Sequence, residues 1–195
     1  PMGSEFPFPF VGTPSTTDRY SAASGYQTKD EFTVIRFGGS YATAVASDWL
    51  LRVAASGQYA QNALPAGEQL GLAGSNAVRG FQERAVAVDR GYFANFEFYS
   101  PDVAASIGLP GNMKWLAFFD AARGFNLDSV AANPQLNHRV NLASLGVGFR
   151  YNIKKDVNVR LDVARVMDGV WRVGSPAPVA SDGDIRGHFS LAFGF

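Results

Sequence analysis

Apolar and polar residues alternate along most of this chain, and the alternation predicts β-strands. In residues 139–153, Leu145 and Phe149 fall on one face, while Ser144 and Arg150 fall on the other. Period-two matches of this kind predict strands at 31–45, 48–60, 91–99, 113–121, 139–153, 156–166 and 187–195. No helical period persists for long, so the pattern predicts an all-β, antiparallel fold.

The connections between these strands alternate in length. The turns at Ala46–Ser47 and Lys154–Lys155 are short, whereas links rich in Gly, Pro, Asn and Asp occupy 61–90, 122–138 and 168–186. On the side of the short turns, only the link 100–112 is longer than expected. Short turns on one side and long loops on the other are typical of a transmembrane β-barrel, which predicts 61–90 as a long extracellular loop. Because such barrels have even strand numbers, about eight strands are expected, with 6–12 as the eighth despite its two prolines.

The two faces of the predicted strands favour a membrane barrel over a soluble one. The apolar faces carry aromatic residues toward the strand ends, as an interfacial belt would: Trp49, Tyr59, Tyr92, Trp115 and Tyr151. The opposite faces are rich in Arg, Asp, Glu and Gly, which suits a polar lumen. A soluble ligand-binding barrel of lipocalin type also alternates, and it remains the alternative together with a stand-alone small barrel of structural or adhesive role.

Composition limits the remaining classes. Of the 195 residues, 47% are hydrophobic and only 17% charged, below the roughly 25% of soluble proteins. No apolar run approaches the roughly 18 residues of a membrane helix. The net charge of +0 gives no basic field for nucleic acid, and the absence of cysteine excludes disulfides and thiolate metal sites. Residues 1–6 read as an expression remnant, which leaves 7–195 as one barrel domain.

No pattern in the sequence indicates catalysis, a cofactor or a metal. His138 and His188 are far apart and lack the spacing of metal ligands. The stretch GLAGSNAVRG has no following Gly-Lys-Ser/Thr, so it is not a phosphate-binding loop. No Ser-His-Asp arrangement stands out. The sequence therefore predicts a protein that is not an enzyme.

One stretch, GSNAVRGFQERAVAVDRGYF at 74–93, interrupts the alternation. It contains Val78, Arg79, Gly80 and Phe81, which resemble the VRG[FY] loop motif of the BamA-like superfamily of outer-membrane translocators and insertases. Further matches follow in order: DRG and NFE at 89–97, FFDA at 118–121, LASLGVG at 142–148, RLDVAR at 160–165, and the closing strand at 188–195. Together they resemble the barrel of two-partner secretion transporters, the TpsB family of FhaC, ShlB and HecB types.

The resemblance implies roles for particular residues. The loop would fold into the barrel, where Arg79 would pair with Glu97 and with Asp120, the acid of the F-x-D strand motif that begins at Phe118. From the residues alone, the favoured interpretation of Arg79 is a solvated loop charge that pairs with Glu83 or with nothing. The closing strand matches the signal by which the assembly machinery recognises outer-membrane proteins, carried by Phe189, Leu191, Phe193 and Phe195.

The resemblance also implies a function and a setting. It predicts the C-terminal half of a sixteen-stranded barrel in the bacterial outer membrane, without the family's POTRA domains. The intact transporter would export a partner exoprotein of haemolysin or adhesin type, and an outer-membrane assembly factor is the alternative. Val88 and Ala122 depart from the family pattern, where glycine is usual.

For this chain alone, the sequence predicts a small closed barrel with 61–90 displaced or only partly inserted, since eight strands leave an interior that side chains fill. The strand arginines would then neutralise Glu97 and Asp120 in place of Arg79. Open strand edges would otherwise favour self-association.

Overall fold

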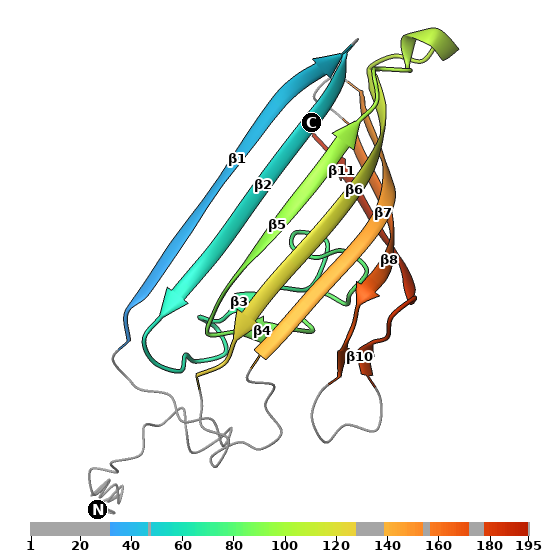
Figure 1. Ribbon diagram of the computed structural model, residues 1–195. Helices are drawn as coiled ribbons and strands as arrows, with labels where there is room; N and C mark the ends of the chain where they lie inside the picture. The colour runs from blue at the N-terminus through green and yellow to red at the C-terminus, as the bar shows by residue number, and fades with distance from the viewer. Residues whose placement is uncertain (1–31, 47, 128–138, 154–156, 172–177, 195) are drawn as a thin grey trace, which may run out of the picture.

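Seven long strands form one antiparallel sheet in the order β1-β2-β5-β6-β7-β8-β11 (Figure 1). The computed structural model describes residues 32–46, 48–127, 139–153, 157–171 and 178–194. The sheet strands are β1 (Val34–Ala46), β2 (Trp49–Ala60), β5 (Arg90–Tyr99), β6 (Asn112–Phe125), β7 (Arg139–Ile153), β8 (Val157–Asp168) and β11 (Ile185–Phe193). The all-β prediction is confirmed.

All seven predicted strands are present, with small changes at their ends. The strand predicted at 139–153 matches β7 at both ends, and the one predicted at 113–121 is extended to Phe125 in β6. The closing strand begins two residues earlier than predicted, at Ile185. The proposed eighth strand at 6–12 and the remnant at 1–6 lie outside the described residues.

The sheet has an outer face and an inner face, which alternate along every strand as the sequence pattern predicts. On β6, Trp115 and Phe119 are exposed on the outer face, whereas Leu116 and Phe118 are buried on the inner face. The outer face carries stacked and tilted aromatic pairs, such as Trp49 with Phe98 at 4.9 Å between ring centroids. Large apolar side chains thus cover the outside of the sheet, the reverse of a soluble barrel.

The segment between β2 and β5, residues 61–89, is called the motif loop here. It contains the short strands β3 (Leu70–Gly71) and β4 (Ala87–Val88), which pair with each other. Its apolar side chains form a core with the inner face, joining Leu72, Val78, Phe81, Val86 and Val88 of the loop to residues including Val140, Leu142 and Val166 of the strands. Figure 1 shows this segment running across the inside of the curved sheet.

The remaining short elements lie at the two ends of the sheet. A 3-10 turn, η1 (Ala105–Ile107), lies between β5 and β6 at the end where β1 turns into β2, called the turn end. The strands β9 (Val170–Trp171) and β10 (Pro178–Ala180) pair beyond β8, at the end from which the motif loop leaves, called the loop end.

The described residues form a partial β-barrel. Among them, β1 pairs with β2 alone and β11 pairs with β8 alone, so each leaves one backbone edge unpaired in the part of the chain that the structure describes. No helix within those residues is long and apolar enough to cross a bilayer.

Candidate functional site: an anchored loop inside the sheet

A tight turn in the motif loop presents Arg79 to the strands. The Gly74 N–H donates to the Val78 carbonyl at 3.0 Å, and the Ala77 N–H donates to the Gly74 carbonyl at 3.1 Å. The Glu83 carboxylate accepts the Ser75 N–H at 2.6 Å and closes the turn from the other side. Partial burial disfavours the charged Glu83 carboxylate and is the largest single effect, but hydrogen bonding to Ser75 together with the nearby His188 and Arg160 holds the pKa of Glu83 below its usual range.

Arg79 is bound almost entirely by carboxylates of the sheet. Its Nε and Nη2 atoms donate to the two oxygens of Asp120, each at 2.7 Å, which is a bidentate pair. Its backbone N–H adds a third bond to Asp120 at 3.1 Å, and Nη1 donates to Glu97 at 2.9 Å. Only 1% of the Arg79 surface is exposed. The ring of Phe118 lies 3.5 Å from the guanidinium carbon, so an aromatic face covers the cation.

Arginines of the strands balance Glu97 and a third buried acid, Asp162. Arg52 and the Tyr99 hydroxyl donate to the same oxygen of Glu97, at 2.8 and 2.9 Å. Arg150 and Arg160 both donate to Asp162, which is fully buried and lies 3.7 Å from Arg79. Because buried charges are costly unless paired, the network ties the loop to β5, β6 and β8 together.

The residues that flank Arg79 complete the attachment. Gly80 has a φ of +93°, in the region that favours glycine, and its N–H donates to Nε2 of His188 on β11 at 3.1 Å. Arg160 donates to the Ser75 carbonyl at 2.9 Å. Val78 and Phe81 are fully buried in the apolar core on either side. The four motif residues therefore contact strands on both sides of β7.

Asp89 fixes the base of the motif loop, a role that the sequence reading did not assign. This fully buried carboxylate accepts the Leu64 N–H at 2.9 Å, the Gln69 amide at 3.1 Å and the Leu127 N–H at 2.7 Å. It joins the start of the loop, its middle and the segment after β6. The only signal for it was the position of Asp89 at the head of the DRG match.

A polar cavity of about 270 Å³ remains beside Arg79 on the inner face. Its lining includes Arg52, Arg150 and Arg160 together with Glu97 and Tyr99. Within the described residues, no group of histidine, cysteine and acidic side chains is arranged to hold a metal ion. The arrangement can hold a loop in place and present a charged inner wall.

Two sequence predictions about the loop are wrong. The motif loop is not displaced, because Val78, Arg79 and Phe81 are all buried against the inner face. Nor do the strand arginines take over Asp120, whose oxygens bind Arg79 instead. An open sheet has more room inside than a closed eight-stranded barrel, and the inner charges pair with the loop as well as with one another.

The structure places the other candidate residues as follows. Phe118 and Asp120 lie on the inner face, against Arg79. Phe189, Leu191 and Phe193 are exposed on the outer face of β11, and Phe195 lies outside the described residues. Asp162 pairs with the strand arginines Arg150 and Arg160 and also lies 3.7 Å from Arg79.

Comparisons with known proteins identify relatives of this chain. A family model described as haemolysin secretion/activation protein ShlB/FhaC/HecB matches residues 11–151. The chain is 25% identical over 153 residues to the heme/hemopexin transporter protein HuxB of Haemophilus influenzae. The aligned residues cover 77% of this chain and 26% of HuxB. The HuxB protein of strain ATCC 51907 / DSM 11121 / KW20 / Rd is 25% identical over 146 residues, covering 73% and 25%.

The chain thus spans about a quarter of the length of the curated relatives it matches. These relatives are transporters, and the family match covers most of the chain, including the whole motif loop and the strands β1 to β6. The inserted loop stands within that matched stretch, whereas β8 and β11 lie beyond it. The chain belongs to the haemolysin secretion/activation protein family of ShlB, FhaC and HecB.

Proposed function

We propose that this chain is the barrel part of an outer-membrane transporter of two-partner secretion, which exports a partner exoprotein. The observation that carries the proposal is the motif loop anchored on a charged inner wall by Arg79, under a sheet whose outside is apolar. Family membership and the likeness to proteins named as heme/hemopexin transporters support it.

The apolar outer face supports the membrane location. Side chains such as Phe37, Tyr41, Val147 and Phe189 are between 59% and 67% exposed on the outside of the sheet. In water so large an apolar surface would drive association, whereas in a bilayer it is satisfied by lipid. We expect the protein to need detergent or lipid and to migrate differently on gels before and after heating. A monodisperse protein in detergent-free buffer would contradict the location.

The proposed role of the anchored loop is to keep the inner wall in its transport-ready arrangement. Removing Arg79 leaves Asp120 and Glu97 without their shared partner, so the loop loses its strongest attachment. Assembly in the membrane should survive, because the motif lies outside the sheet strands and the outer face is unchanged. Transport here needs shape and charge alone, and no chemical step is assigned to the chain.

The test is secretion by the intact transporter carrying Arg79→Ala or Arg79→Lys. Both variants should reach the outer membrane at normal levels and release little exoprotein into the medium, since lysine cannot copy the bidentate bond to Asp120. The matched control is Arg84→Lys, the same substitution at an exposed arginine five residues along the loop. Normal secretion by both Arg79 variants would reject the anchoring role.

A further inference from the structure

The outer face carries a small number of charged residues, most of them arginine. In the described strands of the sheet, strand alternation places Arg90, Arg123, Arg139 and Arg165 on the outer face. The register irregularity near the end of β8 also sets Asp168 opposite the outer-face residue Ala143, and alternation places no other acidic residue of these strands on that face. The acids Glu97, Asp120 and Asp162 are all on the inner face. Lipid-facing charges are costly near the middle of a bilayer and much less costly near its interfaces. The position of each arginine along the bilayer normal therefore decides whether it is tolerated.

Three of these arginines gather around one aromatic ring at the loop end. The guanidinium carbons of Arg90, Arg123 and Arg139 lie 5.8, 5.4 and 5.5 Å from the ring centroid of Phe125. The sheet register produces this grouping, because Phe125 stands directly between Arg90 on β5 and Arg139 on β7. We name these three side chains the arginine cluster.

The arginine cluster has no anionic partner within the described residues. No ion pair joins Arg90, Arg123 or Arg139 to any described carboxylate, in contrast to Arg52, Arg79, Arg150 and Arg160 on the inner face. The Nε atom of Arg123 is buried and makes no hydrogen bond in that part of the chain. Three neighbouring cations repel one another, so an anion that bridges them would be favoured.

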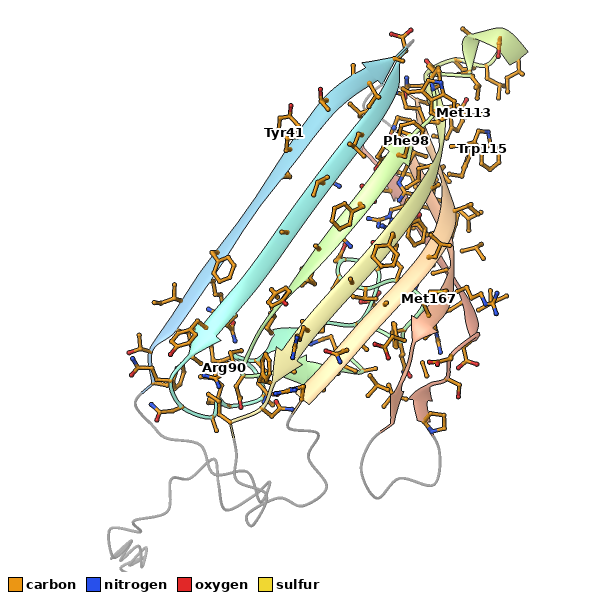
Figure 2. All side chains as sticks on the ribbon, in the orientation of Figure 1. Tyr41, Arg90, Phe98, Met113, Trp115 and Met167 are labelled. Atoms are coloured by element: carbon orange, nitrogen blue, oxygen red, sulfur yellow. The ribbon has the colours of Figure 1, made fainter. Side chains whose placement is uncertain are left out.

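The position of the arginine cluster along the bilayer normal fits the membrane interface at the loop end. Trp115 and Arg123 are eight residues apart on the outer face of β6, which is roughly 26 Å along a strand and about 20 Å along the normal at the usual tilt. The apolar band of such barrels is about 25 Å tall. With Trp115 and Phe98 at the turn end and Arg90 at the opposite end (Figure 2), the guanidinium groups can extend from the band into the headgroup layer.

We propose that the arginine cluster binds the phosphate groups of a lipid headgroup in the leaflet at the loop end. Guanidinium binds phosphate in a bidentate way, and three guanidiniums around one ring suit a headgroup with more than one phosphate. The site lies just outside the strands whose inner faces hold the motif loop. A bound lipid would therefore brace β5, β6 and β7 from the outside. This inference rests on the proposed membrane location.

The test is lipid binding by the purified protein in non-ionic detergent, followed by native mass spectrometry. The probe is lipid A carrying two phosphates, compared with dephosphorylated lipid A and with inorganic phosphate. We expect the bisphosphorylated lipid to bind, and the combined change Arg90→Gln, Arg123→Gln and Arg139→Gln to weaken its binding by on the order of a hundredfold. Each single change, which disturbs the fold less, should weaken it by about fivefold.

The matched control is Arg186→Gln, at the same end of the sheet but at an inner-face position of β11. It should leave lipid binding unchanged. Equal binding by the triple variant, an equal loss in the control, or equal binding of dephosphorylated lipid would each overturn the inference. Displacement by millimolar inorganic phosphate would also overturn it, because the site would then be a free-phosphate site.

This experiment also separates the inference from the proposed function. A triple variant that still needs detergent and still shows heat-modifiable migration, yet binds the lipid normally, rejects the arginine cluster alone. A wild-type protein that stays monodisperse without detergent rejects the membrane location itself.

Discussion

Two regions of the inner face share one alternating sequence pattern and differ in the burial of their side chains and of their ion pairs. The covered region is the inner face of β5 to β8, under the motif loop, and the edge region is the inner face of β1. In the covered region Phe118 is 2% exposed and Asp120 is fully buried. In the edge region the inner residues of β1 are exposed, and Arg36 pairs with Glu68 although their side chains are 57% and 44% exposed.

The difference shows that the interior is buried where the apolar core of the motif loop packs against the strands. The ion pair of Arg36 is short, at 2.6 Å, but water competes for both partners. The ion pairs of Arg79 are of similar length and are shielded on every side. Exposed pairs contribute roughly 0–1 kcal/mol, whereas breaking a buried pair costs about 3–5 kcal/mol.

The largest effect should come from removing the cation in the covered region. In Arg79→Met the loop loses its attachment to Asp120 and Glu97, and the population with the loop open should rise by about a hundredfold or more. Trypsin cleavage after Arg84 measures that population, because proteolysis follows the open form when opening is fast. The chain in detergent micelles is sufficient for this measurement.

The matched variant is Arg36→Met, which removes the exposed cation of the edge region. We expect cleavage after Arg84 to change by less than about fivefold, since the lost pair is solvated. If both variants increase cleavage equally, burial by the loop does not distinguish the two regions.

The strands of both regions could be predicted because alternation is a local property. The predicted 48–60 and 139–153 agree with β2 and β7 to within a residue, since every second side chain there is apolar. The end of β6 was missed because Ala122, Arg123 and Gly124 do not read as a strand. They form one because both neighbours, β5 and β7, supply hydrogen-bonding partners as far as Phe125.

The site was only partly predictable, because its contacts join residues far apart in the chain. The acids Glu97 and Asp120 were placed on the inner face by alternation, and the family resemblance pointed Arg79 toward them. Nothing local to the sequence indicates that Gly80 meets His188, 108 residues later, or that Asp89 binds Leu127. The prediction of the loop position was wrong because it assumed a closed barrel whose interior is filled by side chains, whereas the described sheet is open.

A double-mutant cycle should give the next largest effect. Arg79→Met and Asp120→Leu each leave a buried polar partner unsatisfied, whereas the double variant leaves fewer unpaired charges. We expect a coupling free energy of about 1–3 kcal/mol, measured from urea unfolding in micelles. The same cycle at Arg36 and Glu68 should give under about 1 kcal/mol. Additive effects at Arg79 and Asp120 would mean that their contact contributes nothing specific.

An effect of similar size is expected at the glycine of the motif. Gly80 has a φ of +93°, and an added Cβ would lie 3.3 Å from Cβ of Ala164. Gly80→Ala should destabilise the protein by about 1–3 kcal/mol through backbone strain. Gly39→Ala on β1 is the control, because its Cβ would meet nothing within 4 Å, and it should change the unfolding free energy by less than about 0.5 kcal/mol. Equal losses in the two variants would contradict this account.

The smallest effect concerns Asp102, an exposed aspartate at the turn end that contrasts with the buried Asp120. Its carboxylate accepts the Met113 N–H at 2.8 Å and the Ala104 N–H at 2.9 Å, and these bonds hold the pKa of Asp102 below its usual range. The pKa of Asp102 is lower in the folded protein than in the unfolded chain, where it is about 3.9. The charged carboxylate therefore stabilises the turn at pH values above the unfolded pKa, and this contribution is lost as the pH falls through the folded pKa.

Asp102→Asn keeps an oxygen that can accept both bonds but removes the titration. Amide hydrogen exchange at Met113, corrected for the intrinsic effect of pH, should therefore accelerate in the wild type as the pH falls below about 4, and it should stay flat in the variant. The change should be small, because an exposed carboxylate is screened by water and salt. A wild-type profile as flat as that of the variant would show that the two N–H bonds do not favour the charged carboxylate.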